Sequence, residues 1–594
     1  MSDYSAPLDD MRFVINEIAG LESIAALPGY EDASPDLIDA VLEEAAKFGG
    51  EVLAPLNRSG DTLGCVLENG VVRSPDGFKQ AYASFVESGW NGIPFDPEYG
   101  GQGLPWLVAT AVSEIWDAAN MAFSLCPMLT QGTVELLSAH GTDDQKAKFL
   151  PKLISGEWNG TMNLTESQAG TDLALLRAKA EPEGDHYRIS GQKIFITYGE
   201  TDFTENIVHM VLARTPDAPP GVKGISLFIV PKFMVNADGS LGERNDLRCV
   251  SIEHKLGIHA SPTAVMAYGD DGGAIGYLVG EENQGLQYMF TMMNNARLAV
   301  GLEGVAVAER SYQQARDYAQ DRVQGTTGTS GGEAVAIIQH PDVRRMLLSM
   351  RAQTEATRAL AYYLAAAIDK AKRHPDADER RRHQALVDLL IPVVKGWSSD
   401  VGIDVANTGV QVHGGMGFIE ETGAAQHLRD VRITAIYEGT NGIQAIDLVG
   451  RKVGREGGAT ARALIETMRA DLLALPAVGD MEPVRQRLAD GIDALAKATD
   501  WLVDSFADDP NAVAAGAVHY MKLLGIVAGG WLMTKAAATA NVKLAAGDGD
   551  PRYLKGKLVT TRFFADHILV QSAGLAEAFT TGGASVAAAA EDLF

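Results

Sequence analysis

Residues 435–444 read AIYEGTNGIQ and place one carboxylate, Glu438, between an aromatic residue and a glycine, with the hydroxyl of Thr440 two positions further on. A glutamate flanked in this way suits a partly dry pocket, where loss of water raises its pKa and makes it a stronger base. The same residues also suit a helix start, with Glu438 near the positive end of the dipole and Thr440 as the cap. Local sequence alone favours the helix start, so the rest of the chain must decide.

Length and composition limit the class of protein. A chain of 594 residues is too long for one hydrophobic core, so three or four domains are expected. Hydrophobic residues at 46% and charged residues at 21% are typical of a globular protein. The net charge of −27 argues against a nucleic-acid partner, because binding phosphate chains needs basic patches. A small anionic ligand is still compatible, since a few donors suffice to hold it.

The cysteines and the N-terminus bear on location. Cys65, Cys126 and Cys249 lie far apart and form no C-x-x-C pair, which indicates a reducing compartment. The first four residues lack a basic region followed by an apolar run, so no signal peptide is expected. The longest strongly apolar stretch, residues 523–534, is too short to cross a bilayer. These features predict a cytoplasmic protein with no transmembrane segment.

Hydrophobic periodicity divides the chain into four predicted domains of an α+β multidomain protein. Residues 1–160 show apolar spacing typical of helices, whereas residues 161–282 carry β-branched, partly alternating runs separated by turns. Helical spacing returns over residues 283–450. Residues 451–594 are alanine-rich and helical after a linker-like start, and we expect a four-helix bundle there.

Several familiar sites are absent from the sequence. It contains no G-x-G-x-x-G, G-x-x-x-x-G-K-[ST], H-E-x-x-H or G-x-S-x-G motif. The twelve histidines show no metal-ligand spacing, so no metal is expected. A Rossmann dehydrogenase, a P-loop enzyme and a metallohydrolase are therefore unsupported.

Three clusters of small and polar residues lie beside regular elements: residues 162–172 (MNLTESQAGTD), 195–199 (FITYG) and 411–418 (QVHGGMGF). The first suits a bound phosphate, although a turn with a cap explains it as well. The second places an aromatic residue beside a hydroxyl, which a core phenylalanine also explains. The third lets backbone approach a pyrophosphate closely, although a helix C-cap also needs glycine.

The motifs follow one another from residue 90 to about residue 449 as G-W…P-x-E-Y-G-G-x-G, G-T-x-x-Q-K…F-L-P, L-T-E-S-x-A-G-T-D, F-I-T-Y-G, K-L-G, Q-V-H-G-G-x-G and Y-E-G-T-N-G-I-Q. This order resembles the flavin-dependent acyl-CoA dehydrogenase family. The resemblance implies an N-terminal helical domain, a middle β-barrel-like domain and a C-terminal four-helix-bundle domain, here with an additional C-terminal helical domain. The start (residues 4–13) and the helical tail resemble the branch that contains bacterial 3-methylmercaptopropionyl-CoA and long-chain acyl-CoA dehydrogenases.

The resemblance implies FAD-dependent oxidation of a saturated acyl-CoA to its trans-2-enoyl-CoA, with electrons passed to electron-transfer flavoprotein. Glu438 matches the base that removes the α-proton, while flavin N5 takes the β-hydride. The backbone N–H of Glu438 and the ribityl 2′-hydroxyl would donate to the thioester oxygen as an oxyanion hole. The substrate is expected to be 3-(methylthio)propanoyl-CoA or a medium- to long-chain fatty acyl-CoA.

The resemblance also assigns FAD contacts. Phe195 replaces the commoner tryptophan, and Arg322 matches the arginine of an R-x-x-F-G motif but lacks the phenylalanine three residues later, where Gly325 stands. The assigned residues are Leu164, Thr165, Gly170, Thr171, Phe195, Ile196, Thr197, Arg322, His340, Gln411, Gly414, Gly415, Thr440 and Gly442. Gln411, Gly414 and Gly415 match a segment that the neighbouring subunit inserts against the adenosine half of FAD. The helical tail matches an additional bundle that covers the surface on which shorter family members pair two dimers into a tetramer. A homodimer is therefore expected.

Substrate contacts are assigned by the resemblance to Thr171, Asn294, Arg297, Tyr437 and Gly439. Asn294 stands where the family often has aspartate, and Arg297 suits either the CoA or the support of the Glu438 loop. Two other hypotheses stay open: an oxidase-like or nitroalkane-oxidase-like flavoenzyme that uses oxygen, and a non-catalytic acyl-CoA-binding relative.

Overall fold

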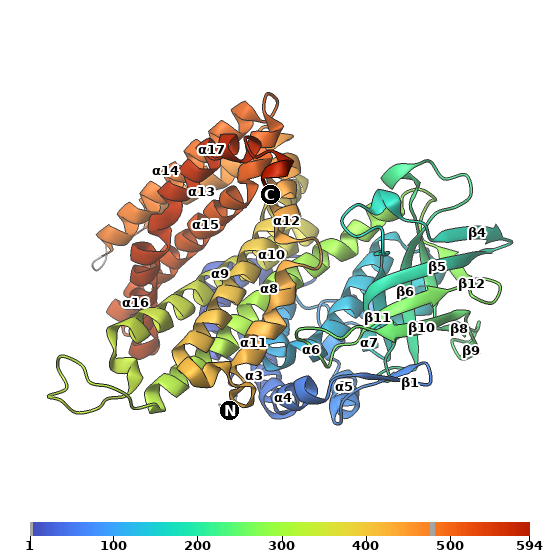
Figure 1. Cartoon of the computed structure of the whole chain (residues 1–594), viewed down its shortest axis with the longest axis horizontal. Helices are drawn as coiled ribbons and strands as arrows, with labels where there is room; N and C mark the ends of the chain where they lie inside the picture. Colours follow the sequence, from blue (N-terminus) through green and yellow to red (C-terminus); the bar gives the residue numbers. More distant parts are fainter. Residues whose placement is uncertain (1–3, 476–480) are drawn as a thin grey trace. The chain divides into compact units, whose positions relative to one another are not determined.

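The computed structural model describes residues 4–475 and 481–594, and Figure 1 shows its elements. The first three residues, which entered the expectation about a signal peptide, lie outside the described part. The chain forms two compact units, of which the first contains Met1–Ala46, Pro105–Ala118 and Val300–Phe594 and the second contains Lys47–Leu104 and Ala119–Ala299.

The second unit contains the β domain. Its eight-stranded sheet has the order β10-β11-β5-β12-β7-β6-β3, with β4 paired to β5. The strands are β3 (Trp158–Asn163), β4 (Lys179–Glu183), β5 (His186–Thr197), β6 (Asn206–Ala213), β7 (Ser226–Pro231), β10 (Leu247–Ile252), β11 (Thr263–Tyr268) and β12 (Ala274–Leu278). Strands β3 and β6 pair in parallel, and β8 (Phe233–Val235) and β9 (Leu241–Arg244) form a separate antiparallel pair. Strands β6 and β7 are buried throughout, as their continuous apolar sequences predict.

The prediction that residues 1–160 are helical is wrong at one place in the second unit. Strands β1 (Val66–Glu68) and β2 (Val71–Arg73) form a hairpin. Asn69 and Gly70 connect them with φ values of 53° and 78°. Asn-Gly tolerates two positive φ angles in succession and is a strong hairpin signal, which outweighed the surrounding helical pattern. The neighbouring helices are α4 (Ala54–Leu63), α5 (Phe78–Glu87) and α7 (Asp143–Ser155).

The first unit is helical. Two long helices, α9 (Pro341–Arg373) and α10 (Ala377–His413), pack along each other, and α10 also contacts α11 (Ala424–Val431) and α12 (Asn441–Asp447). The short α1 (Leu8–Phe13) and α2 (Leu21–Ala25) precede α3 (Pro35–Phe48). Three of the four boundaries between the units fall inside α3, α6 (Trp106–His140) and α8 (Gly285–Asp321), and the fourth lies between Leu104 and Pro105.

The C-terminal extension contains more helices than the predicted bundle of four. They are α13 (Ala459–Ala474), α14 (Glu482–Ser505), α15 (Pro510–Ala546), α16 (Pro551–His567), α17 (Ser572–Thr581) and α18 (Gly583–Ala587). In Figure 1 they form the orange and red layer, in which α15 lies against α14, α16 and α17. Helix α15 ends at Gly547, whose φ of 70° stops the helix.

By length and composition alone, helix α15 could cross a membrane. The sequence had predicted no transmembrane segment because the apolar stretch of residues 523–534 is too short, but the helix that contains this stretch is longer. However, 67% of its most apolar window is buried inside the protein. Its Trp531 is 1% exposed, and the helix contacts both α9 and α10. This burial is that of the core helix of a folded domain.

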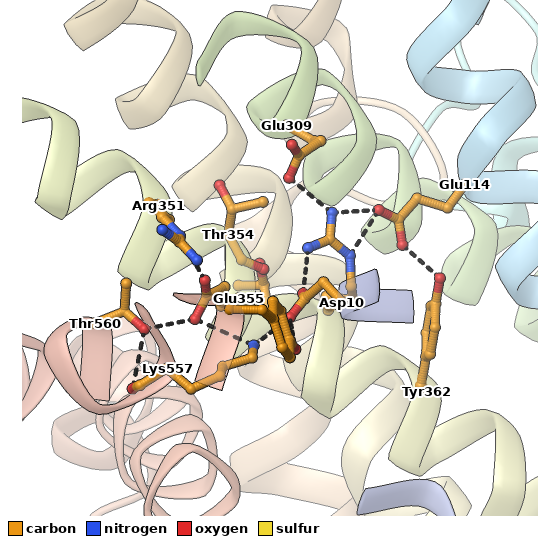
Figure 2. A network of polar contacts seen from close by, with 12 residues as sticks. Asp10, Glu114, Glu309, Arg351, Thr354, Glu355, Tyr362, Lys557 and Thr560 are labelled. Carbon is orange, nitrogen blue, oxygen red and sulfur yellow. Dashed lines mark hydrogen bonds and ion pairs between the residues drawn. The ribbon is translucent and has the colours of Figure 1, made fainter. Parts of the chain in front are cut away.

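A buried ionic network joins this extension to the rest of the first unit (Figure 2). Arg358 of α9 contacts Asp10 at 2.7 Å, Glu114 at 2.6 Å and Glu309 at 2.9 Å. Lys557 of α16 pairs with the same Asp10. Five helices, α1, α6, α8, α9 and α16, therefore meet at one cluster of charges in which each carboxylate has a cationic partner.

Candidate active site

The loop before α12 holds Glu438 in an unusual backbone conformation. Glu438 has a φ of 57° and Gly439 a φ of 83°. A left-handed conformation at a residue other than glycine costs of the order of 1–3 kcal/mol and recurs at functional sites. Thr440 caps α12 by accepting a hydrogen bond from the Ile443 N–H at 3.4 Å. The helix start favoured by local sequence is therefore present, and Glu438 lies just outside it in a strained turn.

Buried groups hold this turn from behind. The ammonium of Lys395, on α10, donates to the carbonyl oxygen of Gly439 and to Oδ1 of Asn441, each at 2.8 Å. The Gln444 amide donates to the carbonyl oxygen of Glu438 at 3.0 Å. Sequence reasoning missed Lys395, although a single lysine within the apolar run of residues 389–397 (LLIPVVKGW) was a usable signal. A buried lysine is rare unless it is paired.

Tyr437 and Gly439 flank the carboxylate of Glu438. The Tyr437 hydroxyl donates to a carboxyl oxygen of Glu303, a buried residue of α8 that sequence reasoning also missed. A Cβ atom at position 439 would lie 2.9 Å from the Gln444 amide nitrogen, and the positive φ adds strain for any side chain. Glycine at this position is therefore a structural requirement of the turn.

In the second unit, a β-bulge places Phe195 on the surface. Strand β5 pairs Ile196 with Ala264 and Lys193 with Met266, so β5 carries one more residue than β11 between these pairs. Phe195 lies in the bulge with a φ of 60° and is 58% exposed. Bulges often redirect a side chain beside an active site. The interpretation of Phe195 as a core residue is thus wrong, and Ile196, at 1% exposed, faces the core instead.

The segment of Leu164 and Thr165 is fixed to β5 by a buried ion pair. Lys193 donates to the Leu164 carbonyl oxygen at 3.0 Å and contacts Glu166 at 2.8 Å. The Ile194 N–H donates to the Thr165 carbonyl oxygen at 2.9 Å. Burial lowers the pKa of Lys193 to about 8 despite the opposing effect of Glu166. The buried pair therefore ties the first polar cluster to the second.

Beyond this pair, the first cluster opens toward the surface. Gly170 and Thr171 are exposed. No atom lies within 4 Å of the position that a Cβ of Gly170 would take. A flat ligand could therefore approach this backbone without a steric barrier.

The glycines of the third cluster end α10. Gly414 has a φ of 60° and caps the helix after His413, so the helix C-cap interpretation holds for this residue. Gln411, Gly414 and Gly415 are exposed, and nothing lies within 4 Å of a Cβ at either glycine. Phe418, four residues further on, is 85% exposed. The segment presents open backbone and apolar side chains.

Arg322 and His340 lie at the base of a glycine-rich hairpin. The His340 ring is 2.8 Å from the carbonyl oxygen of Gln324, and the Ile337 N–H donates to the carbonyl oxygen of Arg322 at 2.7 Å. Arg322 is exposed. The structure thus brings together two predicted residues that the glycine-rich residues 325–332 separate in sequence.

Asn294 and Arg297 lie one turn apart on α8. The Arg297 guanidinium is 3.4 Å from Oδ1 of Asn294, and Arg297 is 5% exposed. Asparagine thus still contacts the arginine at the position where the family has aspartate, although without its charge.

Each unit contributes its own group of the predicted residues. The first unit contains Arg322, His340, Gln411, Gly414, Gly415, Tyr437, Glu438, Gly439, Thr440 and Gly442. The second contains Leu164, Thr165, Gly170, Thr171, Phe195, Ile196, Thr197, Asn294 and Arg297. Each unit, taken by itself, presents residues that fit FAD. The second unit exposes the ring of Phe195 and the open backbone of Gly170, and the first unit exposes the open backbone of Gly414 and Gly415.

Comparison with known proteins identifies the family. The chain matches "Acyl-CoA dehydrogenase, N-terminal domain" over residues 39–157, "middle domain" over 161–270 and "C-terminal domain" over 283–453. Residues 460–590 match "Acetyl-CoA dehydrogenase C-terminal like". The chain belongs to the acyl-CoA dehydrogenase family, and it is an oxidoreductase with the fold that the motifs predicted.

Particular relatives share nearly the whole chain. The chain is 50% identical over 586 residues to 3-methylmercaptopropionyl-CoA dehydrogenase of Ruegeria pomeroyi, covering 98% of this chain and 99% of that one. It is 33% identical to a butyryl-CoA dehydrogenase of Syntrophomonas wolfei, covering 98% of each. A Bacillus anthracis acyl-CoA dehydrogenase structure, complexed with FAD, shares the fold with a TM-score of 0.72 and 21% identity, covering 98% of this chain and 93% of that one. These findings confirm the predicted family, and membership of this flavoprotein family supports FAD as the cofactor.

Proposed function

We propose that this protein oxidises a saturated acyl-CoA to the trans-2-enoyl-CoA, with Glu438 as the base that removes the α-proton. The observation that carries the proposal is the strained turn. Glu438 is held at a φ of 57° while Lys395 and Gln444 fix the adjoining carbonyl groups. An energetically costly conformation held by buried partners is expected where a side chain must be aimed.

The chain's own groups prepare the substrate for proton removal. An α-proton beside a thioester is weakly acidic, so negative charge that develops on the thioester oxygen has to be stabilised. We assign this role to the backbone N–H of Glu438, and Tyr437 and Gly439 line the thioester. Thr171, Asn294 and Arg297 are the proposed further contacts to the acyl-CoA.

FAD, when bound, supplies the acceptor for the β-hydride. Its proposed contacts are Leu164, Thr165, Gly170, Thr171, Phe195, Ile196, Thr197, Arg322, His340, Gln411, Gly414, Gly415, Thr440 and Gly442. The open glycines and the exposed Phe195 support this assignment. We further propose that the electrons pass to electron-transfer flavoprotein, that the protein is a homodimer and that it is located in the cytoplasm. The proposed domain limits are residues 1–160, 161–282, 283–450 and 451–594.

The 50% identity to 3-methylmercaptopropionyl-CoA dehydrogenase supports 3-(methylthio)propanoyl-CoA as substrate, ahead of a medium- or long-chain acyl-CoA. A panel of acyl-CoAs from short to long, including this thioether, with dye reduction as the readout, tests the assignment. The highest kcat/KM is expected for the thioether. A clear maximum at a long fatty acyl chain would contradict it.

Glu438→Gln tests the base. Glutamine keeps the shape of glutamate but does not accept a proton, so the variant is expected to bind FAD and to lose flavin bleaching by substrate. Absorbance of the purified variant measures FAD content, and anaerobic stopped-flow absorbance measures bleaching. Glu421→Gln, an exposed glutamate outside the turn, is the control. Normal bleaching in Glu438→Gln would refute the role of the base.

A further inference from the structure

Glu303 occupies an environment that suits a neutral carboxylic acid. Its side chain is 0% exposed on α8, and one carboxyl oxygen accepts a hydrogen bond from the Tyr437 hydroxyl. The other oxygen, Oε1, is buried and has no hydrogen-bond partner among the residues that the structure describes. A buried carboxylate with an unsatisfied oxygen is costly, whereas the protonated acid carries no net charge to stabilise.

The surrounding charges also favour the neutral form of Glu303. Asp117 of α6 and Glu438 of the turn both raise the pKa of Glu303, and Lys395 of α10 is the facing cation. The ammonium of Lys395 already donates to Gly439 and Asn441. Burial, followed by the charge of Asp117, holds the pKa of Glu303 well above its usual range. Negative charge on neighbouring carboxyl groups disfavours a further negative charge on Glu303.

We propose that Glu303 is a positioning residue that acts as a neutral acid, holding the Tyr437 hydroxyl and thereby the turn without adding negative charge beside Glu438. This inference rests on the proposed role of Glu438 as the base. Tyr437 directly precedes Glu438, so its hydroxyl and the Lys395 contacts fix the turn at both of its ends. An ionised Glu303 would instead repel the carboxylate of Glu438.

Two substitutions separate the hydrogen bond from the charge. Glu303→Ala removes the acceptor, and flavin reduction by substrate is expected to slow by about tenfold with FAD content retained, the effect of losing one such bond. Glu303→Gln keeps a carbonyl oxygen for Tyr437 and no charge, so it should restore most of the rate. In the Glu303→Gln variant, the pH at which the rate of flavin reduction falls on the acid side should be the same as in the wild type.

An infrared difference spectrum between wild type and Glu303→Gln at pH 7 gives a readout other than activity. Loss of the carbonyl stretch of a protonated carboxylic acid is expected. Asp369→Asn is the matched control, because Asp369 is also a buried carboxyl that accepts from a tyrosine, Tyr30, at 2.8 Å. With a pKa of about 6, Asp369 should be mostly ionised at pH 7, and its variant should lack this band loss.

The outcomes distinguish this inference from the proposed function. The inference is overturned if flavin reduction is as slow in Glu303→Gln as in Glu303→Ala, or if Glu303→Ala reduces flavin at the wild-type rate. It is likewise overturned if the infrared difference spectrum of Glu303→Gln shows loss of a carboxylate band. It is also overturned if the acid limb moves down in Glu303→Gln, because that shift would mean that Glu303 is charged in the wild type. The proposed function fails separately, if Glu438→Gln still bleaches flavin.

Discussion

The ammonium of Lys395 lies 2.8 Å from the carbonyl oxygen of Gly439 and 2.8 Å from Oδ1 of Asn441. One buried cation on α10 therefore fixes the residue after Glu438 and the first residue of α12 together. Hydrogen bonds to a charged group contribute about 1.5–3 kcal/mol each. The conformation of Glu438 depends on a lysine that lies more than forty residues earlier in the chain.

Lys395→Met is expected to slow substrate-dependent flavin reduction by about tenfold or more while FAD stays bound, because methionine keeps the volume but donates no hydrogen bond. Anaerobic stopped-flow absorbance measures the reduction. Lys555→Met, which alters an exposed lysine of α16, should behave as wild type. Equal rates in Lys395→Met and wild type would show that the turn holds Glu438 without this cation.

Lys193→Met is expected to lower both stability and FAD content. Removing Lys193 leaves Glu166 buried without its cation, a change that costs about 3–5 kcal/mol, and frees the segment of Leu164 and Thr165. Urea unfolding and the ratio of flavin to protein absorbance measure the two effects. Lys179→Met, an exposed lysine of β4, is the control. Full FAD content in a destabilised Lys193→Met would limit the ion pair to a structural role.

Asp369→Asn is expected to change how stability depends on pH. Asp369 accepts from the backbone N–H groups of Trp106 and Leu107 at 2.8 and 3.0 Å, and burial raises its pKa from 3.8 to about 6. A carboxyl whose pKa is higher in the folded state favours folding below about pH 4, and this contribution is lost as pH rises through about 6. Asparagine does not titrate.

The difference in unfolding free energy between wild type and Asp369→Asn should therefore shift in favour of the variant as pH rises from about 4 to about 6. Urea unfolding at several pH values measures this difference. A difference that is constant over this interval would contradict the raised pKa of Asp369.

Much of the fold was predictable because the signals are local. The β-branched alternation of residues 161–282 predicted the sheet, and helical spacing predicted the long helices. The hairpin at Asn69 and Gly70 was missed although its two-residue signal is strong, because the flanking strands have only three residues each. The bulge at Phe195 had no such signal, since it depends on register with β11, a strand about seventy residues away.

The sequence by itself determined the family and the order of most elements, and it singled out Glu438 as the candidate base, because short motifs and apolar periodicity are local properties. Tertiary structure alone decided which buried groups hold them. The Lys395–Gly439 and Glu303–Tyr437 contacts span 44 and 134 residues. Such pairs form only when helices pack, and burial then determines their strength by removing water from both partners. Glu438 is thus the proposed base by its sequence motif, and packing holds it in a strained conformation with a φ of 57°.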